Sequence, residues 1–337
     1  MNRKKEETKS NPARILELSG KYWESFALHT GVELDIFTLL DEEGMTIDEI
    51  ASELSLSKRG AKAIVSALTA LGFLEKEGEI YYDSREAVEF LSKNSPEYLG
   101  YMVRHHHYLS KYWAFLPKAV KSGKPVKKRS IHHPEKNELE AFLMGMFNNA
   151  SLIAPKVADL IELDDCKTLL DLGGGPGTYA LHFCLKNPKL EAKIYDLKQS
   201  SVFANKLISG FGLDSRIKFV PFDFTKDSID EKFDAVWLSH ILHGEGEKTA
   251  RKIVKKAASS LNKKGKIFIH EFVLDDDGTG PLFPAIFSLN MLVGTKEGKS
   301  YTESEIKNFL ESSGIVEIET LDFEGPSQSR IICGRKK

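Results

Sequence analysis

The chain has 337 residues, 41% of them hydrophobic, and its 47 lysines and arginines nearly balance 49 aspartates and glutamates. This length predicts about two domains, and the net charge of -2 argues against a protein that coats nucleic acid. Three widely spaced cysteines without a CxxC pair exclude a disulfide scaffold or a zinc ribbon, and the sequence shows neither a hydrophobic leader nor an apolar run of membrane length. We therefore expect a soluble, cytoplasmic protein of two domains.

The first hundred residues predict a small helical domain after a polar, disordered tail, residues 1–12. Apolar residues recur at helical spacing over residues 27–40. Thr46, with a glutamate three residues later, is typical of a capping box at the start of the next helix. A second amphipathic helix follows, and residues 72–84 then indicate two short strands around a Glu-Gly turn. Helix, turn, helix and hairpin together indicate a winged-helix domain over residues 13–100.

Residues 101–163 again have a helical pattern, interrupted by a basic loop, and we expect them to form a linker that lines a substrate cleft. Over residues 164–337 apolar strands alternate with helices, which predicts a mainly parallel sheet covered on both faces. The last two strand segments, 315–323 and 329–336, lie close enough in sequence to pair as an antiparallel hairpin. The expected fold class is therefore α/β, a Rossmann-like sheet with an antiparallel C-terminal hairpin behind a mostly α N-terminal domain.

The strongest motif is a glycine-rich loop after the first strand of this sheet. Asp171, Gly173, Gly175 and Gly177 fit an acidic-x-G-x-G-x-G pattern, whereas a dinucleotide fingerprint would need glycine where Thr178 stands. Glycines let the backbone turn sharply and approach a ligand with no side chain in the way. The carboxylate at the strand end suits a ligand that carries an ammonium group and would repel a pyrophosphate.

Two further carboxylates, Asp196 and Asp223, end the next two strands. Ligands of parallel sheets bind in the crevice at the carboxyl ends of the strands. Asp196 is placed there to accept hydrogen bonds from both hydroxyls of a ribose, and Asp223 to accept from an adenine amino group, with Phe224 beside the ring. One such carboxylate alone could be an ordinary turn residue, but three in order behind a glycine loop indicate a nucleoside-type ligand.

Residues 15–335 resemble the class I S-adenosylmethionine (SAM) dependent O-methyltransferases of small molecules, of the caffeic-acid, acetylserotonin and bacterial polyketide type. The segments GVELDIFTLL, LTALGFLEKEGEIYYDS, LDLGGGPGTYA, SHILHGEGEK and GKSYTESEIKNFLESSGI stand in the family's order. The resemblance implies a homodimer formed through the winged-helix domain, a small-molecule acceptor, and SAM as cofactor with S-adenosylhomocysteine as product. The SAM-binding residues expected from motif and resemblance are Asp171, Gly173, Gly174, Gly175, Asp196, Leu197, Asp223, Phe224 and Ser239.

A histidine after the fourth strand is the candidate general base. An imidazole with a pKa of about 6.5 can take a proton near neutral pH, and a positioned base would accelerate methyl transfer to a phenol by about 10²–10⁴-fold. In the resembled family the histidine of an LHDW segment is that base, and His243 matches it. Glu271, at the end of the fifth strand, matches a family glutamate that could hydrogen-bond the imidazole. His240 and His270 are alternative imidazoles, and we favour neither.

Two departures from the family pattern bear on the reaction. Gly244 and Glu245 replace an Asp-Trp pair, and Ser300 stands where plant members have a second glutamate. We expect methyl transfer to a hydroxyl of a small aromatic acceptor. The alternatives are transfer to carbon or nitrogen on the same scaffold, or a SAM-binding relative or ligand-sensing regulator that no longer methylates.

The acceptor pocket is less well defined by the sequence. Candidates are Met146, which matches a family methionine, and Trp113, His107, Asn290 and Met291.

Neither a metal nor DNA is expected as a ligand. Histidines cluster at 105–107 and 132–133, but adjacent histidines on a helix point about 100° apart and do not chelate alone. The basic run 127–129 is either a solvated turn or a contact for an anionic acceptor. Three glutamates make the expected wing acidic, which opposes contact with phosphates, so we assign the winged helix to dimerisation; they are Glu75, Glu77 and Glu79.

Overall fold

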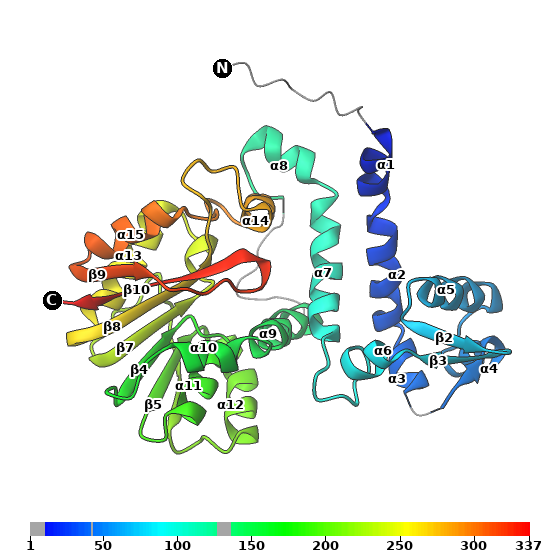
Figure 1. The fold of residues 1–337 in the computed structure, drawn as a ribbon, viewed down its shortest axis with the longest axis horizontal. Coiled ribbons are helices and arrows are strands. Elements are labelled where there is room, and N and C mark those ends of the chain that lie inside the picture. The colour runs from blue at the N-terminus through cyan, green and yellow to red at the C-terminus, as the bar shows by residue number, and fades with distance from the viewer. Residues whose placement is uncertain (1–10, 42, 127–135) are drawn as a thin grey trace. The chain divides into compact units, whose positions relative to one another are not determined.

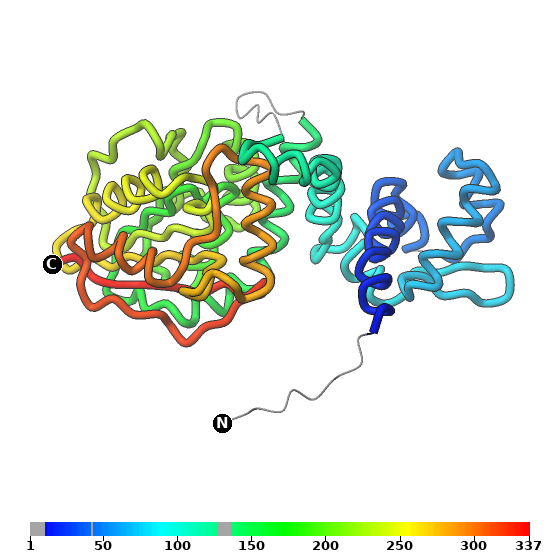
Figure 2. The backbone as a smooth tube through the Cα atoms, turned by 90° about the horizontal axis from the view of Figure 1, so that it is seen from above, coloured from blue at the N-terminus to red at the C-terminus, as the bar shows by residue number. Residues whose placement is uncertain are grey.

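The computed structural model describes residues 11–41, 43–126 and 136–337 (Figure 1). The expectations for residues 1–10 of the N-terminal tail, for the basic run 127–129 and for the histidines at 132–133 fall outside the described residues. The chain divides between His107 and Tyr108 into two compact units, coloured blue to cyan and cyan to red along the chain in Figure 2.

The N-terminal unit contains helices with a small three-stranded antiparallel sheet of order β1-β3-β2. The predicted capping box is confirmed, since the Thr46 hydroxyl accepts from the Glu49 N–H and the Glu49 carboxylate accepts from the Thr46 N–H. The predicted order of helix, helix and hairpin is observed in α4, α5, β2 and β3. The elements are α1 (Pro12–Gly20), α2 (Tyr22–Glu33), α3 (Ile36–Leu40), β1 (Met45–Thr46), α4 (Ile47–Glu53), α5 (Lys58–Ala70), β2 (Leu74–Glu77), β3 (Ile80–Asp83), α6 (Arg85–Phe90) and α7 (Gly100–Trp113), which continues into the second unit.

The second unit alternates strands and helices, as the sequence predicts. Its elements are α8 (Leu116–Ser122), α9 (Lys136–Ser151), α10 (Ala154–Leu160), β4 (Thr168–Leu172), α11 (Thr178–Lys186), β5 (Glu191–Asp196), η1 (Lys198–Ser200), α12 (Ser201–Gly210), β6 (Ile217–Pro221), β7 (Phe233–Ser239), η2 (Leu242–Gly244), α13 (Glu247–Ser259), β8 (Leu261–Phe272), α14 (Leu282–Gly294), α15 (Glu303–Glu311), β9 (Ile315–Thr320), η3 (Pro326–Gln328) and β10 (Ser329–Lys336). Within the described residues, no helix is long and apolar enough to cross a membrane.

Seven strands form one sheet of order β6-β5-β4-β7-β8-β10-β9 (Figure 1). The five strands β4 to β8 pair in parallel, and β10 pairs antiparallel with both β8 and β9, so the expected fold class and the C-terminal hairpin are confirmed. Starting from β4, the next two strands in the chain, β5 and β6, are added on one side of it, and β7 and β8 are then added on its other side. In open α/β sheets, ligands bind at the carboxyl ends of the strands where the order reverses, which here lies between β4 and β7.

Side chains that alternate along the strands form two separate cores. Leu169 and Trp237 pack with residues of α10 and α11, whereas their neighbours Leu170 and Val236 pack with residues of α13 and α15. All four side chains are at most 1% exposed. The strand ends are therefore held from both faces, which gives the residues at the crevice a rigid support.

Candidate active site

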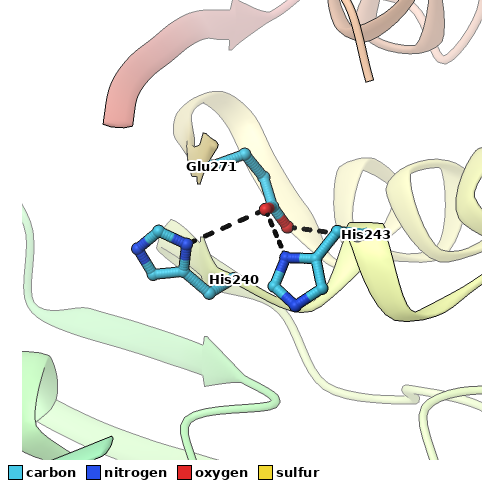
Figure 3. A group of neighbouring side chains, drawn as sticks. All are labelled: His240, His243 and Glu271. Atoms are coloured by element: carbon cyan, nitrogen blue, oxygen red, sulfur yellow. Dashed lines mark hydrogen bonds and ion pairs between the residues drawn. The ribbon is translucent and has the colours of Figure 1, made fainter. Parts of the chain in front are cut away.

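His243 and Glu271 meet at the carboxyl ends of β7 and β8. His243 lies in η2, directly after β7, and its Nδ1 is 2.7 Å from Glu271 Oε2 (Figure 3). The other carboxylate oxygen accepts from the backbone N–H of Leu242 at 2.7 Å and of His243 at 3.4 Å. The hydrogen bond expected from the sequence is therefore present, and the same carboxylate fixes both the ring and the backbone of the loop.

The charge on Glu271 sets which nitrogen of the His243 imidazole faces it with a proton. The Glu271 side chain is 3% exposed, and burial alone would raise its pKa; the neighbouring His243, its hydrogen bond, His240 and the Leu242 N–H together hold that pKa below its ordinary value. Glu271 is thus a carboxylate at neutral pH and can only accept. His243 Nδ1 must then carry a proton toward Glu271, so in the neutral imidazole the free lone pair is on Nε2.

A second imidazole faces the same carboxylate. His240 Nδ1 lies 3.8 Å from Glu271 Oε2, too far for a hydrogen bond (Figure 3). The His240 ring packs against Phe272, with centroids 4.3 Å apart. Burial lowers the pKa of His240 to about 4, although Glu271 opposes this shift. His240 is therefore neutral at pH 7. The sequence named it only as an alternative imidazole.

The side chain of His270 is hydrogen-bonded inside the fold, away from the proposed base. It is fully buried, its Nδ1 lies 3.2 Å from the hydroxyls of Tyr179 and Ser239, and its Nε2 lies 2.9 Å from the hydroxyl of Ser329. Both ring nitrogens are thus engaged within the fold, on the face opposite to Glu271, as strand alternation predicts.

Because His270 is buried, we expect the free energy of unfolding of the second unit to fall at acid pH. Burial lowers its pKa well below 6.5 in the fold, whereas the unfolded chain takes up this proton near pH 6.5. Its contribution to stability is therefore complete above about pH 6.5 and falls by about 1.4 kcal/mol per pH unit as the pH drops toward the folded pKa. Urea unfolding at about pH 7 and about pH 5.5 should show this loss. A His270→Gln variant should lose about 1.4 kcal/mol less over the same interval, and an equal acid loss in both proteins would contradict the assignment.

Aromatic side chains border the proposed base. Phe287 of α14 meets the His243 ring edge-on, with centroids 4.8 Å apart, and Phe272 lies nearly parallel to that ring at 6.0 Å. Phe283 stacks in turn on Phe287 at 5.9 Å. Sequence reasoning missed these three residues. The available signal was the spacing of Phe283 and Phe287, since residues four apart share one face of a helix.

The departure at Ser300 has a structural explanation. Its hydroxyl donates to the Pro284 carbonyl at 2.8 Å and its backbone N–H donates to the Ser288 hydroxyl, and the residue is 2% exposed. Ser300 therefore anchors α14. Tyr301 donates to the carbonyl of Glu245 at 2.6 Å, which ties the segment after η2 to the same region.

The glycine loop begins where β4 ends. Gly173 and Gly177 have φ of +73° and +84°, in the left-handed region that favours glycine. A Cβ on Gly173 would lie 2.6 Å from Ile241, and one on Gly177 would lie 2.3 Å from Ile194. The backbone conformation therefore favours glycine at both positions, and the side chains of Ile241 and Ile194 leave little room for a Cβ there.

Asp171 lies beneath this loop. It is 1% exposed, and neither carboxylate oxygen has a partner that meets the geometry of a hydrogen bond. A Cβ on Gly174 would come within 2.5 Å of the Asp171 carboxyl carbon, so the carboxyl group lies directly under the glycine backbone. Burial, with Asp196 nearby, raises the pKa of Asp171 to about 7, although the backbone N–H of Ala180 opposes this shift. A buried carboxyl without a hydrogen bond is costly, and it fits a site that receives a cationic group.

The carboxylate of Asp196 is tied to the loop from the next strand. Its Oδ2 accepts from the Gly175 N–H at 2.9 Å, and its Oδ1 accepts from the Leu197 N–H at 2.7 Å and the Ser200 hydroxyl at 2.8 Å. Burial raises the pKa of Asp196, and these three donors oppose that shift. The structure thus brings Gly175, Asp196 and Leu197 together.

The other cofactor candidates have partners within the protein. Asp223 accepts from the Thr225 N–H and hydroxyl and pairs with Lys226 at 2.8 Å. Phe224 is half-buried against the core under α13, and Ser239 contacts His270.

The acceptor candidates are divided between the two units. In the second unit the Trp113 indole N–H donates to the Asn290 side-chain oxygen at 2.9 Å, which links α7 to α14, and Met291 is buried beside it in sequence. Met146 is half-buried on α9. His107 belongs to the N-terminal unit, where its ring contacts Phe26 and His29.

Residues 117–316 match the O-methyltransferase domain, and residues 16–93 match the O-methyltransferase dimerisation domain. A curated relative, 3-hydroxy-5-methyl-1-naphthoate 3-O-methyltransferase of Streptomyces sahachiroi, is 31% identical to the chain, covering 96% of this chain and 95% of the relative. The chain belongs to the O-methyltransferase family. The resemblance inferred from the sequence motifs is thereby confirmed.

Two further likenesses place the methyltransferase among its relatives. The solved structure of human N-acetylserotonin methyltransferase in complex with SAM superposes with a TM-score of 0.86, at 23% identity over 98% of this chain and 99% of the human one, and shows the same fold. The N,N-dimethyltransferase OxyT of Streptomyces rimosus is 28% identical over 89% of each chain. The protein is a SAM-dependent O-methyltransferase with a dimerisation domain.

Proposed function

We propose that His243 is the general base of methyl transfer and that Glu271 orients it. The hydrogen bond from His243 Nδ1 to Glu271 carries this proposal, because it leaves Nε2 as the proton acceptor. SAM, when bound, supplies the methyl group and leaves as S-adenosylhomocysteine. His243 Nε2 takes the proton of the acceptor hydroxyl, and the buried Glu271 carboxylate stabilises the imidazolium that results.

We further propose that Asp171 receives the ammonium group of SAM and that Asp196 accepts from its ribose hydroxyls. The unpartnered Asp171 carboxyl under the glycine loop supports the first role. The position of Asp196 beside the same loop supports the second. Asp223 and Phe224 would border the adenine, and the remaining cofactor contacts would come from Gly173, Gly174, Gly175, Leu197 and Ser239.

The acceptor is proposed to be a small aromatic molecule with a hydroxyl group. Support comes from the phenylalanines around His243 and from the relative named for a hydroxyl on a naphthoate ring. Met146, Trp113, His107, Asn290 and Met291 stay candidates for acceptor contacts. Incubation with isotope-labelled methyl-SAM and a panel of phenols and naphthols should place the label on oxygen by NMR. Label on carbon or nitrogen, or no transfer by a protein that binds SAM, would refute this acceptor class.

We also propose a homodimer, formed through the dimerisation domain. Large apolar side chains are exposed on α1 and α2, which supports this assignment; they are Ile15, Leu16, Leu18, Tyr22, Trp23 and Phe26. Burying a charge in such an interface is costly. A Trp23→Asp variant should therefore be monomeric at concentrations where the wild type sediments as a dimer.

Val202 provides the matched control for the dimer. It is 71% exposed on α12, and Trp23 is 70% exposed, so neither substitution disturbs a packed core. Val202→Asp should leave the sedimentation coefficient unchanged. A monomeric wild type, or a dimer that survives Trp23→Asp, would contradict the proposed interface.

We propose a cytoplasmic location, which the three buried, free cysteines support, since such thiols suit a reducing compartment. We expect no nucleic-acid ligand, because the glutamates on and between β2 and β3 are exposed.

A further inference from the structure

Three side chains that commonly bind metals meet beside the proposed base. His240 Nδ1 and His243 Nδ1 lie 3.8 Å and 2.7 Å from the same oxygen of Glu271, and one ligand atom from each residue lies within 4.8 Å of the others (Figure 3). In a tetrahedral site with bonds of about 2.0–2.1 Å, neighbouring ligand atoms are about 3.4 Å apart. The observed separations bracket that value, so small side-chain shifts would complete three corners of such a site.

His240 adds a third candidate ligand to the pair formed by His243 and Glu271. Its Nδ1 is buried without a hydrogen-bond partner. Its backbone has φ +55°, which is uncommon for a residue other than glycine, and its N–H donates to the His270 carbonyl at 2.9 Å. The fold thus holds the imidazole against Glu271 in a conformation that is costly unless its surroundings stabilise it.

The chemical types of the three side chains suit a metal of the zinc type. Metal ligands must be neutral imidazoles or ionised carboxylates. Two imidazole nitrogens and one carboxylate suit Zn²⁺, Co²⁺ or Ni²⁺, whereas Mg²⁺ and Ca²⁺ prefer oxygen ligands throughout.

We propose that His240, His243 and Glu271 form a binding site for a divalent transition-metal ion of the zinc type, and that occupation of this site inhibits methyl transfer. The three protein ligands leave a fourth position for water. The histidine side chains are 22% and 13% exposed, which gives the ion access from solvent.

The inhibition rests on the proposed role of His243 and follows from the proton on its ring. In the metal-free protein that proton is on Nδ1, facing Glu271. A metal bonded to Nδ1 requires the proton to move, through solvent, to Nε2. Nε2 then has no lone pair to accept the proton of the acceptor hydroxyl. Metal binding and general-base catalysis therefore exclude each other at this imidazole.

The binding test uses the full-length protein after chelator treatment, without SAM or acceptor. Titration with Co²⁺, followed by its visible absorption, and calorimetry with Zn²⁺ should give one site per chain. His240→Asn should weaken binding by at least about 100-fold, since loss of an outer partner alone costs about 10- to 100-fold. Asparagine and glycine tolerate positive φ, so His240→Gly serves as a second variant. His182→Gln, which removes an imidazole on α11, should bind as the wild type does.

The activity test compares inhibition within each variant. Zn²⁺ should inhibit the wild type, and at least about 100-fold more Zn²⁺ should be needed for His240→Asn relative to its own metal-free rate. The proposed site would be overturned if His240→Asn bound Co²⁺ as tightly as the wild type does. It would also be overturned if His182→Gln no longer bound Co²⁺. If His243→Ala keeps full activity while Co²⁺ binding still depends on His240, the base assignment fails and the metal site stands, but its inhibitory effect is refuted.

Discussion

Replacing His243 by alanine is expected to lower kcat for methyl transfer by about 10²–10⁴-fold, the contribution typical of a positioned general base. A phenol with a pKa of about 10 is mostly protonated at neutral pH, so its proton must be removed as the new bond forms. His243 is the imidazole whose Nδ1 is fixed by Glu271 and whose Nε2 is left to accept. The affinity for SAM, measured by calorimetry, should stay within a few-fold of the wild type.

Two further measurements separate a base from a structural histidine. The His182→Gln variant removes an imidazole from α11, where it contacts Phe211, and should keep wild-type kcat. Raising the pH toward the pKa of the phenol should restore part of the lost rate in His243→Ala, because the acceptor then ionises without help. If His243→Ala retains most of its activity at neutral pH, the reaction does not depend on this base.

The sequence was sufficient to predict the positions of those site residues that stand near the carboxyl ends of the strands. Glu271 lies one residue before the end of β8, and β8 is the parallel neighbour of β7, so a loop that leaves β7 reaches the carboxylate without a long connection. Asp171 and Asp196 follow the same rule at β4 and β5. These positions could be predicted because the carboxyl ends of parallel strands share one edge of the sheet.

Features that depend on side-chain direction could not be predicted in this way. His240 adopts a left-handed backbone conformation at the end of β7, and this conformation turns its ring toward Glu271. Ser300 lies in a segment without regular structure, and its side chain turns inward to cap a carbonyl of α14. Phe287 reaches His243 from a helix more than forty residues further along the chain. Local pattern carries no information on the directions of His240 and Ser300, and for Phe287 it shows only that this residue shares a helix face with Phe283.

Replacing Asp196 by alanine is expected to weaken SAM binding by on the order of 10²–10⁴-fold. Hydrogen bonds to a charged group contribute about 1.5–3 kcal/mol each, and two ribose hydroxyls would lose their acceptor. The glycine loop would lose a support as well, because the N–H groups of Gly175 and Leu197 both donate to this carboxylate. Calorimetry with SAM and with S-adenosylhomocysteine measures the change.

Ser200→Ala is the matched control for this loss, because it removes one donor to Asp196 and leaves the carboxylate in place. A single neutral hydrogen bond contributes about 0.5–1.5 kcal/mol and one to a charged group up to about 3 kcal/mol, so this variant should bind SAM far better than Asp196→Ala. Thermal unfolding of both variants without ligand shows whether the loop itself is destabilised. If Asp196→Ala binds SAM like the wild type, the ribose is held elsewhere. If both variants weaken binding equally, the carboxylate positions the loop instead of contacting the ribose.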